Sequence, residues 1–210
     1  MANAPTDNFT PFLRKAEQGD TESMFLVGCF YYNGKRITRN YYEAVRWLKC
    51  AADRGHIKAI DVLAMCYYNG QGVTRDYYEA ARLYRKAAEQ GFAEAQCGLG
   101  VCYENGQGVT RDYYEAVRWY RKAAEQGNAN AQRCLGVCYY KGEGVTRDYY
   151  EAARLFRKAA EQGDATAQYN LGCCYYKGEG ITKDISMARY WFIKAADQGN
   201  ENARRALGSM

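Results

Sequence analysis

Residues 92–127 read FAEAQCGLGVCYENGQGVTRDYYEAVRWYRKAAEQG, and this stretch decides the fold because the chain repeats it. Its closing glycine, Gly127, belongs to a series that recurs every 36 residues without an insertion or deletion. The other members of the series are Gly19, Gly55, Gly91, Gly163 and Gly199. A fixed period of roughly 20 to 50 residues is typical of a solenoid, in which each repeat buries its apolar face against its neighbours. The sequence therefore predicts one elongated, repetitive domain.

The period divides the chain into five full repeats with a partial repeat at each end. The full repeats are residues 20–55, 56–91, 92–127, 128–163 and 164–199. Residues 1–19 are predicted to form an N-terminal capping helix, with Thr10 as its N-cap and Pro11 at its first helical position. Residues 200–210 are predicted to form a partial sixth repeat or a C-terminal cap.

Each repeat is predicted to contain two helices, which we call the first and the second helix of the repeat. In repeat three, Ala95, Leu99, Cys102 and Tyr103 recur at three-and-four spacing, which predicts a first helix over about 93–105. The glycine-rich loop that follows, Asn105-Gly106-Gln107-Gly108, is predicted to end this helix.

The second helix of repeat three is predicted to begin after Asp112. Asp112 is a favourable N-cap, and Glu115 follows three residues later, as in a capping box. Ala116, Trp119, Tyr120, Ala123 and Ala124 share one face of this helix. Gly127 is predicted to be its C-cap, which gives an antiparallel helix pair joined by a short loop.

The order of these residues resembles the Sel1-like repeat, a relative of the tetratricopeptide repeat. In repeat three the resemblance is carried by Ala95, Leu99-Gly100, Tyr103, Gly106-x-Gly108-Val109, Asp112, Ala116, Trp119-Tyr120, Ala123-Ala124 and Gly127. It covers residues 20–210 and implies an all-α fold, a right-handed α-solenoid of antiparallel helix pairs. Two departures, Arg36 in place of a loop glycine and Ala64 in place of the glycine after Leu63, affect local geometry only.

Composition and charge exclude several classes of protein. The 29 basic and 24 acidic residues give a net charge of +5, but they are interleaved within every repeat. Nucleic-acid binding normally needs a clustered basic stripe, so neither nucleic acid nor a membrane surface is predicted as a partner. Residues 1–10 contain no basic segment followed by an apolar one, and the expected location is the cytoplasm.

Nine cysteines occur at irregular spacing, and their odd number favours a reducing compartment. Four of them occupy one position of the repeat and are predicted to be reduced thiols packed as small apolar groups: Cys66, Cys102, Cys138 and Cys174. This pattern departs from the secreted, cysteine-rich Helicobacter branch of the family, in which cysteines are paired. Cys134 and Cys138 lie one helical turn apart, but two ligands make a poor metal site.

No cofactor, metal or catalytic residue is predicted. His56, the single histidine, has no evident Ser or Cys partner. The Gly-x-Gly loops follow the C-terminal end of a helix, where the helix dipole repels anions, so they are predicted to form turns and not phosphate sites.

A partner is predicted to bind the first helices, on the face opposite their core residues. That face includes Cys97 and differs from repeat to repeat, whereas the outer face of the second helices changes little. In related helical-repeat proteins the first helices line the concave side of the superhelix. The predicted partner-binding residues are Phe25, Tyr32, Lys58, Asp61, Tyr68, Glu104, Arg133, Tyr140, Lys141, Tyr169, Tyr176 and Lys177. Their aromatic members are expected to form an exposed row; the alternative, that these rings pack between repeats, stays open.

These features, with the resemblance, predict a non-enzymatic scaffold or adaptor. Its partner would be a protein or peptide, with acidic groups toward the C-terminal repeats, in signalling, assembly or neutralisation of an effector. The expected state is a monomer, with end-to-end stacking through the incomplete C-terminal repeat as an open alternative. Two other hypotheses remain: a β-lactam or cell-wall-fragment binding protein or hydrolase, as the cysteine-rich branch implies, and a redox or metal sensor.

Overall fold

The computed structural model describes residues 9–34 and 37–210, and within these residues every regular element is an α-helix. The helices are α1 (Thr10–Glu17), α2 (Thr21–Asn33), α3 (Tyr41–Asp53), α4 (Ile57–Asn69), α5 (Tyr77–Ala88), α6 (Ala93–Asn105), α7 (Tyr113–Glu125), α8 (Ala129–Lys141), α9 (Tyr149–Glu161), α10 (Ala165–Lys177), α11 (Ile185–Asp197) and α12 (Glu201–Gly208). The predicted all-α fold is confirmed. Arg36, one of the two departures from the repeat pattern, lies outside the described residues.

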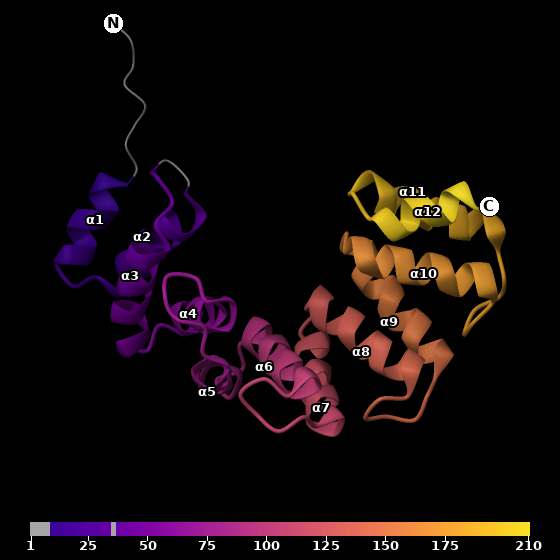
Figure 1. Cartoon of the computed structure of the whole chain (residues 1–210), viewed down its shortest axis with the longest axis horizontal. Coiled ribbons are helices and arrows are strands. Elements are labelled where there is room, and N and C mark those ends of the chain that lie inside the picture. The colour runs from indigo at the N-terminus through magenta and orange to yellow at the C-terminus, as the bar shows by residue number, and fades with distance from the viewer. Residues whose placement is uncertain (1–8, 35–36) are drawn as a thin grey trace, which may run out of the picture. The chain divides into compact units, whose positions relative to one another are not determined.

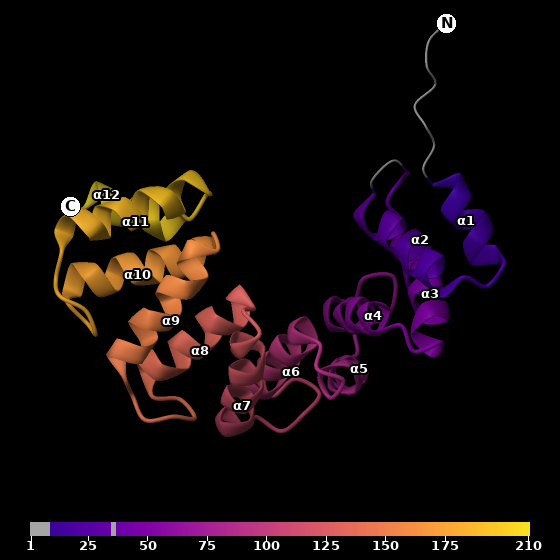
Figure 2. The ribbon, with the colours of Figure 1, turned by 180° about the vertical axis from the view of Figure 1, so that it is seen from behind.

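The chain divides into two compact units, residues 1–110 and 111–210, which we call the N-terminal unit and the C-terminal unit. The N-terminal unit contains α1 to α6 and the C-terminal unit contains α7 to α12 (Figure 1). Within each unit, every helix packs against the next helix in the chain. Figures 1 and 2 show this plainly for α8 to α11, which follow one another as layers. The fold is a helical-repeat solenoid with a 36-residue period.

The helix boundaries follow from local capping chemistry. The Asp112 side chain accepts hydrogen bonds from the backbone N–H groups of Tyr114 (2.9 Å) and Glu115 (3.1 Å), which confirms it as the N-cap of α7. The left-handed Gly106 ends α6, as predicted. Two capping predictions are wrong by one residue. The C-cap of α7 is Gln126, with Gly127 just beyond it, and the residue that precedes α1 is Phe9 and not Thr10.

The core lies between successive helices, and it requires small residues where they approach closely. A Cβ atom added to Gly136 of α8 would lie 2.7 Å from the ring of Phe156 in α9, so glycine lets this ring pack on the helix backbone. Cys66, Cys102, Cys138 and Cys174 are all buried. Burial raises the pKa of three of these thiols, Cys66, Cys102 and Cys174, to about 12, so they behave as small apolar groups at neutral pH.

Among the described residues, none of the helices is both long and apolar enough to cross a membrane.

Candidate functional site

The predicted partner-binding residues differ in how far they reach solvent. Lys58, Lys141, Tyr176 and Lys177 are exposed, and the other eight are half-buried. The expected row of exposed aromatic rings is therefore wrong for all members except Tyr176, which is 44% exposed.

The half-buried tyrosines of the first helices are bonded to the loop of the next repeat. The hydroxyl of Tyr32 donates to Gln71 Oε1 (2.8 Å), and the hydroxyl of Tyr140 donates to Glu179 Oε2 (2.6 Å). Tyr68 makes the equivalent bond to Gln107. Each ring also meets a tyrosine at the start of the second helix edge to face, with centroids 5.1 to 5.3 Å apart. These rings connect successive repeats, as the alternative interpretation of the sequence allowed.

Two other predicted residues contact the N-terminal end of the first helix in the following repeat. Phe25 stacks on His56, the N-cap of α4, with ring centroids 4.5 Å apart. Arg133 donates to Asp164, the N-cap of α10, at 3.1 Å. Cys97, predicted on the free face, is buried.

His56 has a structural role that accounts for both of its ring nitrogens. Its Nδ1 accepts the backbone N–H of Ala59 (3.1 Å), and its Nε2 lies 2.9 Å from Glu22. The histidine therefore caps α4 and connects it to α2.

In the C-terminal unit, three of the predicted residues gather around one hollow. Tyr140 and Lys141 from α8 and Lys177 from α10 line a cavity of about 260 Å³, which we call the α8–α10 hollow. Its remaining lining residues are Val137, Phe156, Asn170 and Cys173. The hollow thus combines apolar walls with two ammonium groups.

The two lysines of the α8–α10 hollow are held by nearby oxygen atoms. Lys177 Nζ donates to the Tyr140 hydroxyl (3.0 Å) and lies 3.6 Å from Glu179, while Lys141 Nζ lies 3.5 Å from Glu143. The hydrogen bond from Lys177 to Tyr140 raises the pKa of Lys177, so the ammonium stays charged. Burial raises the pKa of Tyr140, which keeps its hydroxyl neutral. The hollow therefore places two ammonium groups, each with a glutamate close by, beside apolar surface.

The described residues contain no group of three or more His, Cys, Asp or Glu side chains able to hold a metal ion, and none of the nine cysteines forms a disulfide.

The most exposed aromatic residues lie on the second helices, where the sequence analysis expected only a repeated outer face. They are Tyr42 (71% exposed), Tyr78 (72%), Tyr114 (77%) and Tyr150 (69%). Each is the second residue of its helix, and in α3, α5 and α9 it directly follows the tyrosine that packs against a tyrosine of the first helix. The sequence signal was the repeated Tyr-Tyr-Glu-Ala motif, in which the second tyrosine lies off the face that carries the core alanines.

Comparisons with known proteins agree on the family. The Sel1 repeat family matches residues 21–56, 57–92, 93–128, 129–164 and 165–200. Among solved structures, c5321 of uropathogenic Escherichia coli, a protective antigen with an SLR fold, is 38% identical with a TM-score of 0.85. The match covers 97% of this chain but only 44% of the E. coli chain. A Sel1 repeat protein from Oxalobacter formigenes is 34% identical with a TM-score of 0.83, covering 97% of this chain and 87% of its own.

A more distant likeness shows the fold alone. The immunity protein Pa5087 from Pseudomonas aeruginosa is 23% identical with a TM-score of 0.56, covering 95% of this chain and 70% of that chain. A search of curated proteins found no match. Sel1-repeat proteins generally serve as scaffolds for protein–protein interaction and are typically not enzymes. The five matched repeats, which span most of the chain, show that it belongs to the Sel1 repeat family.

Proposed function

We propose that this chain is a non-enzymatic scaffold that binds a segment of a partner protein in the α8–α10 hollow. The observation that carries the proposal is the convergence of Tyr140, Lys141 and Lys177 on one cavity with apolar walls. An acidic side chain of the partner would pair with the lysines, and an adjacent apolar side chain would contact Val137 and Phe156. The family's general role as an interaction scaffold supports the proposal.

The remaining predicted residues of the first helices would extend this contact or position it. Exposed Tyr176 borders a smaller cavity of about 160 Å³, which shares Cys173 with the α8–α10 hollow. We propose that this binding serves signalling, assembly or neutralisation of an effector. We also keep the repeat boundaries that the 36-residue period predicts. The free thiols favour a reducing compartment such as the cytoplasm.

The proposal takes the chain to be a monomer, and sedimentation would detect end-to-end stacking through α12 as a concentration-dependent rise in mass. In the described residues nothing specifically favours the alternative, a β-lactam or cell-wall-fragment binding protein or hydrolase. That alternative is implied only by the resemblance to the branch of the family with paired cysteines.

The proposal is tested by reversing one exposed charge at the hollow. Proteins captured from a lysate by the wild type would be compared with those captured by Lys141→Glu and by Lys86→Glu, a matched exposed lysine on a second helix. We expect at least one captured protein to lose about tenfold in affinity with Lys141→Glu and to bind Lys86→Glu normally, as measured with the purified pair by calorimetry. If no captured protein distinguishes the two variants, the hollow is not the binding site.

A further inference from the structure

A different kind of hollow recurs on the side of the second helices, once in each unit of the chain. In the C-terminal unit a cavity of about 500 Å³ lies between α9 and the loop before α11. In the N-terminal unit a cavity of about 320 Å³ lies between α5 and the loop after α6. We call them the α9 hollow and the α5 hollow. The first is lined by Tyr150, Ala153, Arg154, Arg157, Gly180, Ile181 and Thr182. The second is lined by Tyr78, Ala81, Arg82, Arg85, Gly108 and Val109.

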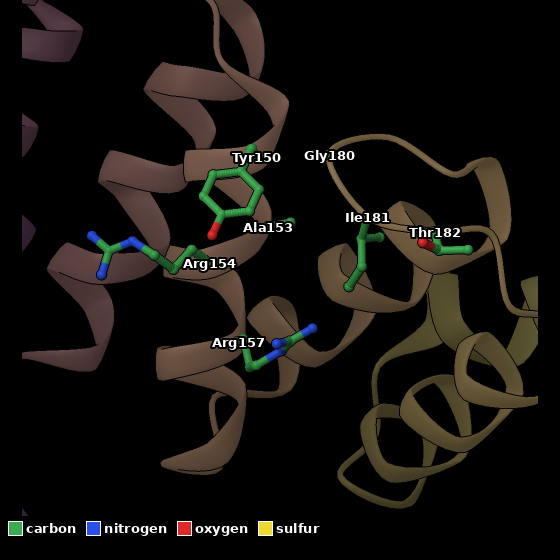
Figure 3. Close-up of a pocket in the computed structure, with 7 residues that line it drawn as sticks. All are labelled: Tyr150, Ala153, Arg154, Arg157, Gly180, Ile181 and Thr182. Atoms are coloured by element: carbon green, nitrogen blue, oxygen red, sulfur yellow. The ribbon is translucent and has the colours of Figure 1, made fainter.

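Figure 3 shows how the side chains of the α9 hollow are arranged. Tyr150, Ala153 and Arg154 lie along α9, and Ile181 and Thr182 lie across from them on the loop. The guanidinium of Arg157 points toward the loop, whereas that of Arg154 points away from it. The hollow therefore has an exposed aromatic ring on one side, an aliphatic side chain on the other, and a single cation directed between them.

The two arginines of each hollow have different partners. Arg154 Nε donates to Glu151 at 2.7 Å, so its charge is compensated within the helix. Arg157 donates instead to the neutral hydroxyl of Tyr175 at 3.0 Å and lies 5.9 Å from the centre of that ring.

The α5 hollow repeats this division of partners. Arg82 pairs with Glu79, and Arg85 donates to the hydroxyl of Tyr103 at 2.9 Å. None of the residues that line either hollow carries a carboxylate. Each hollow thus keeps one arginine, Arg85 or Arg157, whose positive charge is not balanced by an acidic side chain in the described residues of the chain.

The base of each hollow is an alanine, at a position where repeats one and three carry valine. Ala81 and Ala153 are buried in repeats two and four, and the equivalent residues of repeats one and three, Val45 and Val117, are buried too. The backbone therefore accepts valine at this position. The smaller side chain opens room beneath the exposed tyrosine in repeats two and four.

We propose that the α5 and α9 hollows each bind an acidic residue of a peptide segment together with its apolar neighbour. In the α9 hollow the peptide carboxylate would pair with Arg157, which retains N–H donors beyond the one used by Tyr175. The apolar neighbour would fill the space above Ala153 and pack between Tyr150 and Ile181. The two hollows lie on second helices, α5 and α9, whereas the charged residues of the α8–α10 hollow lie on first helices. The inference therefore goes beyond the proposed function and does not depend on it.

Charge complementarity and shape both favour a peptide as the occupant. A small anion would meet the one available guanidinium but leave the aromatic and aliphatic walls unused, and a purely apolar group would leave the arginine charge without a counter-ion. In a residue pair such as Glu-Leu, the glutamate can pair with the arginine and the leucine can contact the aromatic and aliphatic walls. Because each unit of the chain holds one hollow, two molecules of such a peptide should bind per chain.

The test uses the full chain and a short peptide of alternating Glu and Leu, with a Gln-Leu peptide of equal length as its control. Calorimetry should find two sites for the Glu-Leu peptide and much weaker binding of the control. Ala81→Val and Ala153→Val should each remove one site. Both variants should fold, as thermal unfolding would show, because Val45 and Val117 occupy the same position in repeats one and three. Arg157→Gln should weaken one site by about tenfold.

Arg121→Gln is the matched control for the arginine. Arg121 makes the same contact, to the hydroxyl of Tyr139 at 3.2 Å, in a repeat that carries Val117. Its substitution should leave both sites intact.

Several results would overturn the inference. They are unchanged binding by the Ala81→Val/Ala153→Val double variant, equal binding of the Gln-Leu peptide, and complete competition by inorganic phosphate at concentrations that match the peptide. Self-association of the wild type that disappears in the double variant would identify a second copy of the chain as the occupant instead.

Discussion

The two helices of a repeat carry tyrosines of the same chemistry in opposite situations. Tyr140, near the end of a first helix, is half-buried and bonded to Glu179 of the next repeat, whereas Tyr150, at the start of the following second helix, is 69% exposed. The difference arises from the loop of the next repeat, which covers the end of the first helix and leaves the second tyrosine of the second helix free. Neighbouring repeats, more than residue type, therefore decide which aromatic groups can meet a ligand.

The largest effect is expected from a substitution in the loop that covers the end of the first helix. Gly180 has a left-handed backbone (φ 70°), and a Cβ atom there would lie 1.9 Å from the carbonyl oxygen of Tyr149. Gly180→Ala should therefore lower the free energy of unfolding by about 3 kcal/mol or more, because the loop must move away from α9. The same movement should disturb both the bond to Tyr140 and the α9 hollow.

Gly199→Ala is the control for this substitution. Gly199 also has a left-handed backbone (φ 88°), but a Cβ atom there meets nothing within 4 Å, so only the conformational term of about 1 kcal/mol is expected. Urea unfolding of both variants measures the difference. Equal losses would show that the loop does not pack closely on α9.

The first helices also differ from repeat to repeat, and one of these differences should make the stability of the protein depend on pH. Asp61 and Arg133 occupy the same position in repeats two and four, but Arg133 pairs with Asp164 whereas burial, and then Glu94, raise the pKa of Asp61 to about 7. Because this native value lies above that of an unfolded aspartate, the native state binds more protons between about pH 4 and pH 7. The contribution of Asp61 to stability is therefore complete below about pH 4 and is lost as the pH rises through about 7.

Asp61→Asn should remove this loss. The variant should be more stable than the wild type at about pH 8 by on the order of 2 kcal/mol, since the half-buried carboxyl keeps some contact with water, and the difference should disappear near pH 4. Urea unfolding at a series of pH values measures it, with Asp53→Asn, an exposed residue of α3, as the control. A stability difference that does not change with pH would contradict the assignment.

The sequence predicted those features that depend on one repeat alone. The period, the limits of α6, the Asp112 cap and the buried cysteine position all follow from local spacing and capping chemistry. It failed where a contact comes from another repeat. The bond from Tyr140 to Glu179 spans 39 residues, and Cys97 is buried although it lies off the core face of its own helix, so a projection of one helix assigns both to an open surface.

The exposed tyrosines were overlooked for a related reason. The outer face of the second helices changes little from repeat to repeat, so its sequence does not single out Tyr78 and Tyr150, which are among its most exposed residues. Similarly, the exchange of Val45 and Val117 for Ala81 and Ala153 is a small change in sequence. Its consequence becomes visible only when the loop of the next repeat is in place above it.

The most direct test of the central claim removes one hydroxyl group from each kind of tyrosine. Tyr140→Phe should lower the free energy of unfolding by about 1 kcal/mol, because Glu179 and Lys177 lose their shared partner, whereas Tyr150→Phe should change it by less than about 0.5 kcal/mol. Urea unfolding of the two variants at one pH provides the comparison. Equal losses, or a larger loss for Tyr150→Phe, would contradict the claim that the loop of the next repeat separates structural tyrosines from those free to bind a ligand.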